Sequence, residues 1–249
     1  DLFFGVFMTT DRINHFLFEH YETEGEYYEE FMEFYRKLDD YIGEIRAMLP
    51  DDVTLVVASD HGFTTLDYEV HCNRWLEQEG WLEYEGDEPE ELGDIADGTE
   101  AYSLIPGRFY INLEGREPRG AVPEEEYEQK RDELEAALES MTGPDGEPVI
   151  DRVETSEDAY RGDHADIAPD LVAIPNHGFD LKSGFSGEGP VFDTGPRNGM
   201  HSFDNACLYV DDDDARVSDA DLYDIAPTVL SLLDVDYDRG SFDGTALVR

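Results

Sequence analysis

The chain has 249 residues, of which 40% are hydrophobic and 12% aromatic, a composition typical of a folded globular protein. Its 62 Asp and Glu residues outnumber its 17 Lys and Arg residues, which gives a formal net charge of -45. This charge disfavours direct binding to nucleic acid or to an anionic membrane. No apolar run approaches the ~20 residues of a membrane span, so we expect no membrane partner.

The acidic residues are spread along the whole chain, between apolar segments, and do not form one tail. Like charges at this density destabilise a compact state in dilute salt, and salt screens that repulsion. We therefore expect adaptation to very high salt, as in a halophilic archaeon. An ordinary acidic protein is the alternative, because net charge bears on solubility and not on fold.

A strand, a helix and a second strand are predicted at the start of the chain. The run "LFFGVFM" (2–8) is short, continuous and apolar, as in a buried strand. From Tyr27 to Met48 the apolar residues recur at helical spacing, until Pro50 ends the pattern. Residues 53–58 form the second apolar run. Two apolar strands joined by a helix favour a parallel sheet that is covered on both faces.

The middle of the chain predicts a small α+β lobe. After a short helix within 70–84, residues 83–100 are acidic and predict a loop, "GRFYINL" (107–113) predicts a strand, 123–141 a helix and 149–155 another strand. We expect residues 102–160 to be a lobe inserted into a single domain that covers 1–249.

The main sheet is expected to resume at 169–176 and 206–210, separated by a Gly- and Pro-rich loop over 177–200. Residues 225–233 predict a final helix, with Asp224 as its N-cap and Pro227 in its first turn. The predicted fold class is α/β: a mostly parallel sheet flanked by helices, with the inserted α+β lobe. Cys72 and Cys207 belong to no CxxC motif, and we interpret both as free, buried thiols.

Side chains that commonly bind metal ions lie near the ends of the predicted strands. Asp11 and His15 follow the first strand at a spacing that puts both on one face of a helical turn. Asp60 and His61 follow the second strand in "VVASDHGF", and His201 precedes the strand at 206–210. Ligands bind beyond the carboxyl ends of parallel strands, and carboxylate and imidazole are ligands of zinc and manganese. Each residue alone is more often a helix cap or a structural histidine; together they predict a metal site.

The same segments resemble a known family. They are "TDRINH" (10–15), "VVASDHGF" (56–63), "GRFYINLEGREPRG" (107–120), "APDLVAIP" (168–175), "GMHSFDNACLYV" (199–210) and "YDIAPTVLSLLDV" (223–235). In this order they resemble the alkaline phosphatase superfamily and, within it, the type I phosphodiesterase/nucleotide pyrophosphatase branch. The resemblance covers nearly the whole chain and implies an alkaline-phosphatase-like fold.

The resemblance also implies two divalent metal ions, zinc or else manganese, that bridge a phosphoryl group. By motif position, Asp11, His15 and His201 would hold one ion, and Asp60 and His61 the other. The family's Thr or Ser nucleophile and a further Asp precede the segment matching 2–8, so we expect this chain to be a fragment, without a catalytic nucleophile of its own. Thr9 and Thr10 do not occupy the nucleophile's motif position.

The implied function is metal-dependent hydrolysis of a small-molecule phosphate ester, most simply a phosphodiester or nucleotide pyrophosphate bond, in the cytoplasm. The alternatives are a sibling activity, namely a phosphomonoesterase, phosphonate hydrolase, sulfatase or phosphoglycerate mutase, or a non-catalytic metal-binding remnant. Other polar residues receive a structural or surface interpretation: His20, His71, His164 and His177, then Arg108, Tyr110 and Asn112, and the acidic pair Asp163 and Asp166.

Overall fold

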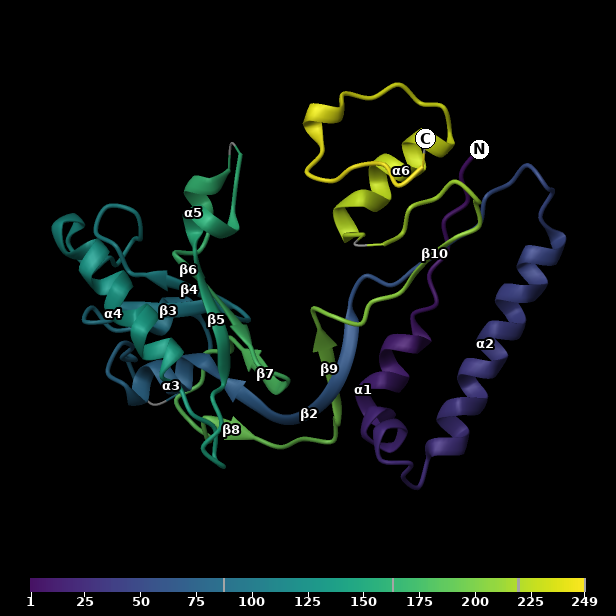
Figure 1. Cartoon of the computed structure of the whole chain (residues 1–249). Coiled ribbons are helices and arrows are strands. Elements are labelled where there is room, and N and C mark those ends of the chain that lie inside the picture. The colour runs from purple at the N-terminus through teal and green to yellow at the C-terminus, as the bar shows by residue number, and fades with distance from the viewer. Residues whose placement is uncertain (87, 163, 219, 249) are drawn as a thin grey trace. The chain divides into compact units, whose positions relative to one another are not determined.

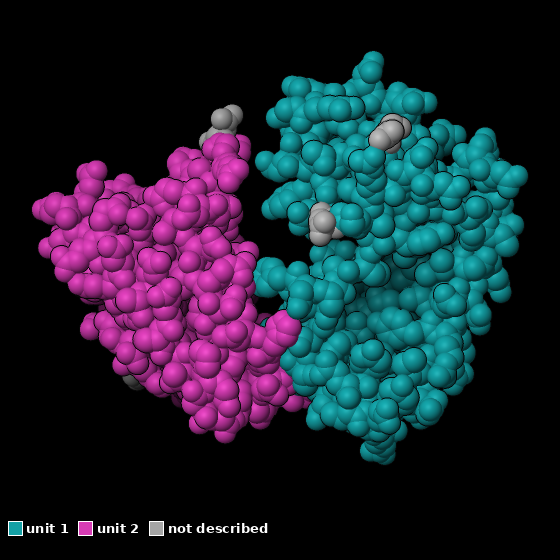
Figure 2. Space-filling view, viewed as in Figure 1, with its two compact units in different colours: residues 1–65, 197–249 teal, residues 66–196 magenta. Residues whose placement is uncertain are grey.

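A computed structural model of the chain describes residues 1–86, 88–162, 164–218 and 220–248, so Asp163 of the acidic pair lies outside the described residues. The chain divides into two compact units, which are coloured separately in Figure 2. Unit 1 combines residues 1–65 and 197–249, and unit 2 is residues 66–196. Strand β2 (Gly62–His71) contributes to both.

Unit 1 contains helices and short strands drawn from both ends of the sequence (Figure 1). Besides the start of β2, its elements are α1 (Thr9–Glu22), α2 (Tyr28–Met48), β1 (Val56–Ala58), β9 (Gly199–Ser202), β10 (Leu208–Val210) and α6 (Ile225–Leu232). Strand β1 pairs antiparallel with β10, and the start of β2 pairs antiparallel with β9. Helix α1 packs against both α2 and β9 around a small core of Phe18, Phe31 and Phe63.

The predicted strand at 2–8 is wrong. Residues 1–7 have no regular secondary structure, and Phe3 and Phe4 are 93% and 81% exposed. A strand needs a neighbour for its backbone groups and a covered face for its side chains. No named strand in the described part of the chain pairs with this segment.

Unit 2 has a larger core. Its elements are the rest of β2, α3 (Cys72–Gln78), β3 (Ala101–Ile105), β4 (Arg108–Ile111), α4 (Tyr127–Glu139), β5 (Ile150–Thr155), α5 (Ser156–Ala159), β6 (Leu171–Pro175), β7 (Gly178–Lys182) and β8 (Phe192–Asp193). One sheet has the order β3-β4-β6-β5, and another has the order β7-β2-β8. Helix α4 packs on the first sheet through the fully buried Leu134 and Leu138.

The α/β class is confirmed, and the sheets are partly antiparallel. Strands β2 and β7 form a parallel pair, whereas β3, β4, β6 and β5 run antiparallel to their neighbours. The reason is visible between β3 and β4, where only Pro106 and Gly107 connect the strands. Gly107 has φ +70, a value that suits glycine in a tight hairpin.

Most helices predicted from spacing are present, but the loop predicted at 177–200 is wrong, because it contains β7, β8 and the start of β9. The sequence also did not predict strand β2, because Asp67 and Glu69 interrupt its apolar residues. The expected inserted lobe at 102–160 stays a prediction. None of the helices among the described residues is long and apolar enough to cross a membrane.

Two smaller expectations are corrected. Asp224 does stand at the N-cap of α6, but its carboxylate accepts hydrogen bonds from the backbone N–H groups of Asp221 and Thr245 instead of capping that helix. These two donors hold its pKa below the ordinary value. Both cysteines are free, but only Cys72 is buried, whereas Cys207 is exposed.

Buried polar side chains hold unit 2 together. Asp170 is 2% exposed and accepts hydrogen bonds from both Nη atoms of Arg116, from the Tyr127 hydroxyl and from the Ile111 backbone N–H, at 2.6 to 2.8 Å. Asn112 is also buried and donates to two backbone carbonyls. Its structural interpretation therefore agrees with its contacts.

Candidate metal centre

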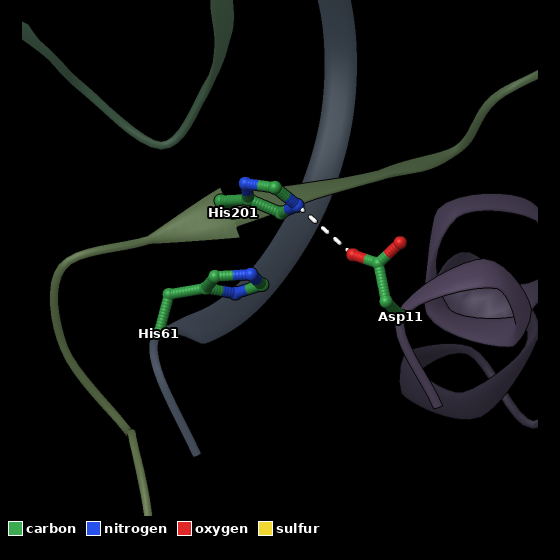
Figure 3. A group of neighbouring side chains, drawn as sticks. All are labelled: Asp11, His61 and His201. Atoms are coloured by element: carbon green, nitrogen blue, oxygen red, sulfur yellow. Dashed lines mark hydrogen bonds and ion pairs between the residues drawn. The ribbon is translucent and has the colours of Figure 1, made fainter. Parts of the chain in front are cut away.

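Three segments of unit 1 bring acidic and imidazole side chains to one place (Figure 3). Helix α1 supplies Asp11 and, one turn later, His15. The segment between β1 and β2 supplies Asp60 and His61, and β9 supplies His201. Asp11, His61 and His201 each offer one ligand atom, and these atoms lie within 4.8 Å of one another.

The contacts between these side chains are short. The His201 Nε2 lies 3.1 Å from the Asp11 Oδ1, and the His15 Nε2 lies 3.5 Å from the same oxygen. The rings of His61 and His201 are stacked with centroids 3.7 Å apart, and those of His15 and His201 are 4.9 Å apart. The cluster is thus one continuous group around the Asp11 carboxylate.

Two of the histidines have backbone partners that determine which ring nitrogen is free. The His15 Nδ1 lies 2.9 Å from the Gly199 carbonyl oxygen, and the His61 Nδ1 lies 3.0 Å from the Gly62 carbonyl oxygen. Because a carbonyl only accepts, each Nδ1 carries the proton and donates. Each Nε2 is left with the lone pair that a cation needs, which is the usual arrangement of metal-binding histidines.

The glycines beside the cluster are required by close backbone approach. A Cβ on Gly62 would lie 1.7 Å from the Asp204 carbonyl oxygen, and one on Gly199 would lie 2.2 Å from the Asn14 carbonyl oxygen. No side chain fits at either distance. Glycine therefore follows Asp60 and His61 because the segment must pass directly beside the chain that leaves β9.

An aromatic side chain that the sequence did not single out supports the histidines. Phe63 is 6% exposed, and its ring centroid lies 5.0 Å from that of His15, 5.3 Å from that of His201 and 5.8 Å from that of His61. The Asn205 side chain accepts from the Phe63 N–H at 2.9 Å and donates to the Phe63 carbonyl at 2.8 Å. The only sequence signal was the position of Phe63 directly after "DHG".

Electrostatics favour a neutral imidazole at His201. Partial desolvation of a side chain that is still 51% exposed, followed by the neighbouring His61, lowers the pKa of His201, although the Asp11 hydrogen bond opposes the shift. A histidine must be neutral to bind a metal ion, so this shift is in the useful direction.

The grouping differs in detail from that implied by motif position. The ligand atoms of His61, Asp11 and His201 group together. His15 is outside this group of three and is more buried, with 17% of its side chain exposed. Asp60 is 83% exposed, and its Oδ1 lies 3.6 Å from the His61 Nε2. Asp60 is therefore at the margin of the cluster, and two groups expected to serve separate ions are neighbours.

The sequence also matches a described family. The family model for type I phosphodiesterases / nucleotide pyrophosphatases matches residues 1–204. This range includes all five candidate ligands, Asp11, His15, Asp60, His61 and His201. No significant match was found among curated proteins or among solved structures.

Proposed function

Because the chain belongs to the type I phosphodiesterase / nucleotide pyrophosphatase family, we propose that it serves in the metal-dependent hydrolysis of phosphodiester or nucleotide pyrophosphate bonds in small molecules. One observation carries the proposal: Asp11, His61 and His201, which come from three distant segments, present ligand atoms within 4.8 Å of one another. Metal-dependent hydrolysis needs carboxylate and imidazole groups that converge on cations, and the cations in turn contact the phosphoryl group.

The donor set fits divalent cations. In our proposal Asp11, His15 and His201 hold one ion, and Asp60 and His61 hold the second. The ring nitrogens that face backbone carbonyls in His15 and His61 support this assignment, because they leave Nε2 of each ring free. Imidazole and carboxylate together suit zinc first and manganese second. When bound, two such ions stabilise the charge on the attacking and leaving oxygens of a phosphoryl transfer.

The chain's own residues have simpler tasks in this proposal. Asp11 supplies negative charge at the centre of the cluster, where His15 and His201 both lie within 3.5 Å of its Oδ1. The buried Phe63 ring packs against the rings of His15 and His201, holds them in position and keeps water from the face that it covers. We assign no nucleophile to the chain, and Thr9 and Thr10 receive no catalytic role. Zinc as the metal, origin in a halophile and a cytoplasmic location stay predictions.

The first test is metal stoichiometry on the folded chain in molar salt, for the wild type, His201→Ala and His164→Ala. His164 is an exposed histidine of unit 2, so its replacement is the matched control. We expect the wild type and the control to retain zinc and His201→Ala to lose it, since removing a ligand leaves the remaining donors short of a stable set. Unchanged zinc content in His201→Ala contradicts the proposal.

Turnover is the second test. In the full-length protein, His201→Ala should abolish hydrolysis of a phosphodiester and of a dinucleotide pyrophosphate, whereas His164→Ala should leave both unchanged. A panel that adds a phosphate monoester, a phosphonate ester and a sulfate ester distinguishes the sibling activities, because one scaffold hosts many substrate pockets. Faster turnover of the monoester than of either diester would transfer the proposal to the monoesterase alternative.

A further inference from the structure

An unpaired arginine lies next to the cluster of Asp11, His61 and His201. Arg12 follows Asp11 directly on α1 and is exposed. In the part of the chain that the structure describes, no hydrogen bond or ion pair engages its side chain. Most other basic residues that the structure describes do pair with a carboxylate, as Lys37, Arg46 and Arg131 do, in a protein with 62 acidic residues and 17 basic ones.

The local sequence keeps Arg12 unpaired. Its neighbours on the helix surface, three and four residues away, are Met8, Thr9, His15 and Phe16, and none is a carboxylate. Several basic residues on other helices do have an acidic neighbour at this spacing. The pairs are Lys37 with Glu33, Arg74 with Glu77 and Arg131 with Glu128.

The place of Arg12 on the helix puts it beside the cluster and not within it. Successive residues turn by about 100°, so Arg12 lies about 60° beyond His15 around the helix axis, on the side away from Asp11. Its Cβ is about 5–6 Å from that of His15, as for any pair at this spacing. A long side chain from that position is suited to a group adjacent to whatever the cluster holds.

The chemistry of arginine defines that group. Guanidinium remains charged at all accessible pH values and offers a planar fork of N–H donors that matches phosphate. The net charge of -45 repels an anionic substrate, so a cation without a partner near the cluster is a local point of attraction. A pyrophosphate-bridged substrate has a second phosphate group next to the reacting one, and a simple phosphodiester has none.

We propose that Arg12 binds the second phosphate group of a pyrophosphate-type substrate and so favours such substrates over simple phosphodiesters. This inference rests on the proposed function, since it takes the Asp11, His61 and His201 cluster as the place of the reacting phosphoryl group. It adds a residue that determines specificity and lies outside the set of candidate ligands.

The test compares AMP with ADP, which differ by one phosphate group, in binding to the zinc-loaded chain by calorimetry. The variants are Arg12→Gln and Arg12→Lys, and Arg36→Gln is the control, since Arg36 is an exposed arginine on α2. We expect Arg12→Gln to weaken ADP binding about tenfold and AMP binding less than about twofold, as for one charge-assisted contact. Arg12→Lys should fall between, and Arg36→Gln should match the wild type.

Zinc content is measured on every sample. Equal losses for AMP and ADP in Arg12→Gln, or no loss for either, overturn the role of Arg12, as does a zinc-loaded wild type that binds ADP no better than AMP. A wild-type chain that binds no zinc contradicts the proposed function instead, and the inference about Arg12 falls with it. The two failures are therefore distinguishable.

Discussion

At Asp170 a single buried carboxylate joins several parts of unit 2. It accepts from Arg116, which lies in the turn after β4, from Tyr127 at the start of α4 and from Ile111 in β4. Burial, followed by the hydrogen bond to Asp170, raises the pKa of Tyr127 to about 12, so that this hydroxyl remains a donor at all ordinary pH values.

We predict that Asp170→Asn lowers the free energy of unfolding by about 3 kcal/mol, because it removes the buried charge that both Nη atoms of Arg116 contact and leaves that guanidinium with Glu117 alone. Urea unfolding measures the change. Asp166→Asn is the control, since Asp166 is an exposed aspartate of the same unit, and it should change stability by less than about 0.5 kcal/mol. Equal stability of the two variants would show that the Asp170 contacts contribute little.

The two thiols should differ in reactivity. Cys72 is fully buried, and burial raises its pKa to about 12, whereas Cys207 is exposed. Because the thiolate is the reactive form, we expect a thiol reagent to modify one cysteine rapidly in the folded chain and the second only after denaturation. Cys207→Ser should remove the rapid phase. A rapid phase that persists in this variant would place the reactive thiol at Cys72.

At the scale of elements, the contact between α1 and β9 determines whether the cluster forms. Gly199 approaches the α1 backbone so closely that a Cβ would meet the Asn14 carbonyl at 2.2 Å, and its own carbonyl oxygen lies 2.9 Å from the His15 Nδ1. The register of β9 on β2 then places His201 opposite Phe63.

We predict that Gly199→Ala separates β9 from α1, destabilises the chain by about 2 kcal/mol and weakens zinc binding, since overpacking shifts the backbone. Gly43→Ala is the matched control. Gly43 lies within α2 with no atom within 4 Å of an added Cβ, so alanine there should stabilise by about 0.5–1 kcal/mol. Thermal unfolding and zinc titration of both variants measure the difference. Undiminished zinc affinity in Gly199→Ala would refute this account of the cluster.

Local patterns predicted the helices better than the strands. The spacing of Phe31, Phe34 and Leu38 indicated α2, because a helix satisfies its own backbone groups. The run 2–8 is more apolar than many strands and yet forms none, since a strand depends on neighbours that the run itself does not encode. Helical spacing likewise predicted that Asp11 and His15 share a face.

The approach of His61 to His201 could not be read from local patterns in the same way. Their rings stack because β2 and β9 pair in one particular register, and that register depends on two glycines and on the Asn205 side chain bound to Phe63. Such contacts join residues more than 130 positions apart. The residue types that would form a site were visible in the sequence, whereas the stacking of His61 on His201 was not.

At the scale of the whole molecule, charge is expected to dominate stability. With a formal net charge of -45, repulsion among carboxylates opposes the compact state, and ions screen it over about 10 Å at 0.1 M and about 3 Å at 1 M. We predict that the free energy of unfolding rises as KCl increases from about 0.1 M to about 2 M. Urea unfolding at each salt concentration measures it, and a flat or falling dependence would contradict adaptation to high salt.

The separation of the cluster residues along the chain has a consequence for the order of folding. His201 lies 190 positions from Asp11, and the Gly199 carbonyl lies 184 positions from His15. Contacts this distant form slowly, since a long loop must close before they contribute any stability. During synthesis, α1 leaves the ribosome long before β9 exists. The candidate ligands therefore come together only after β9 has been made, and a nascent chain that stalls before residue 199 has Asp11, His15 and His61 but lacks His201.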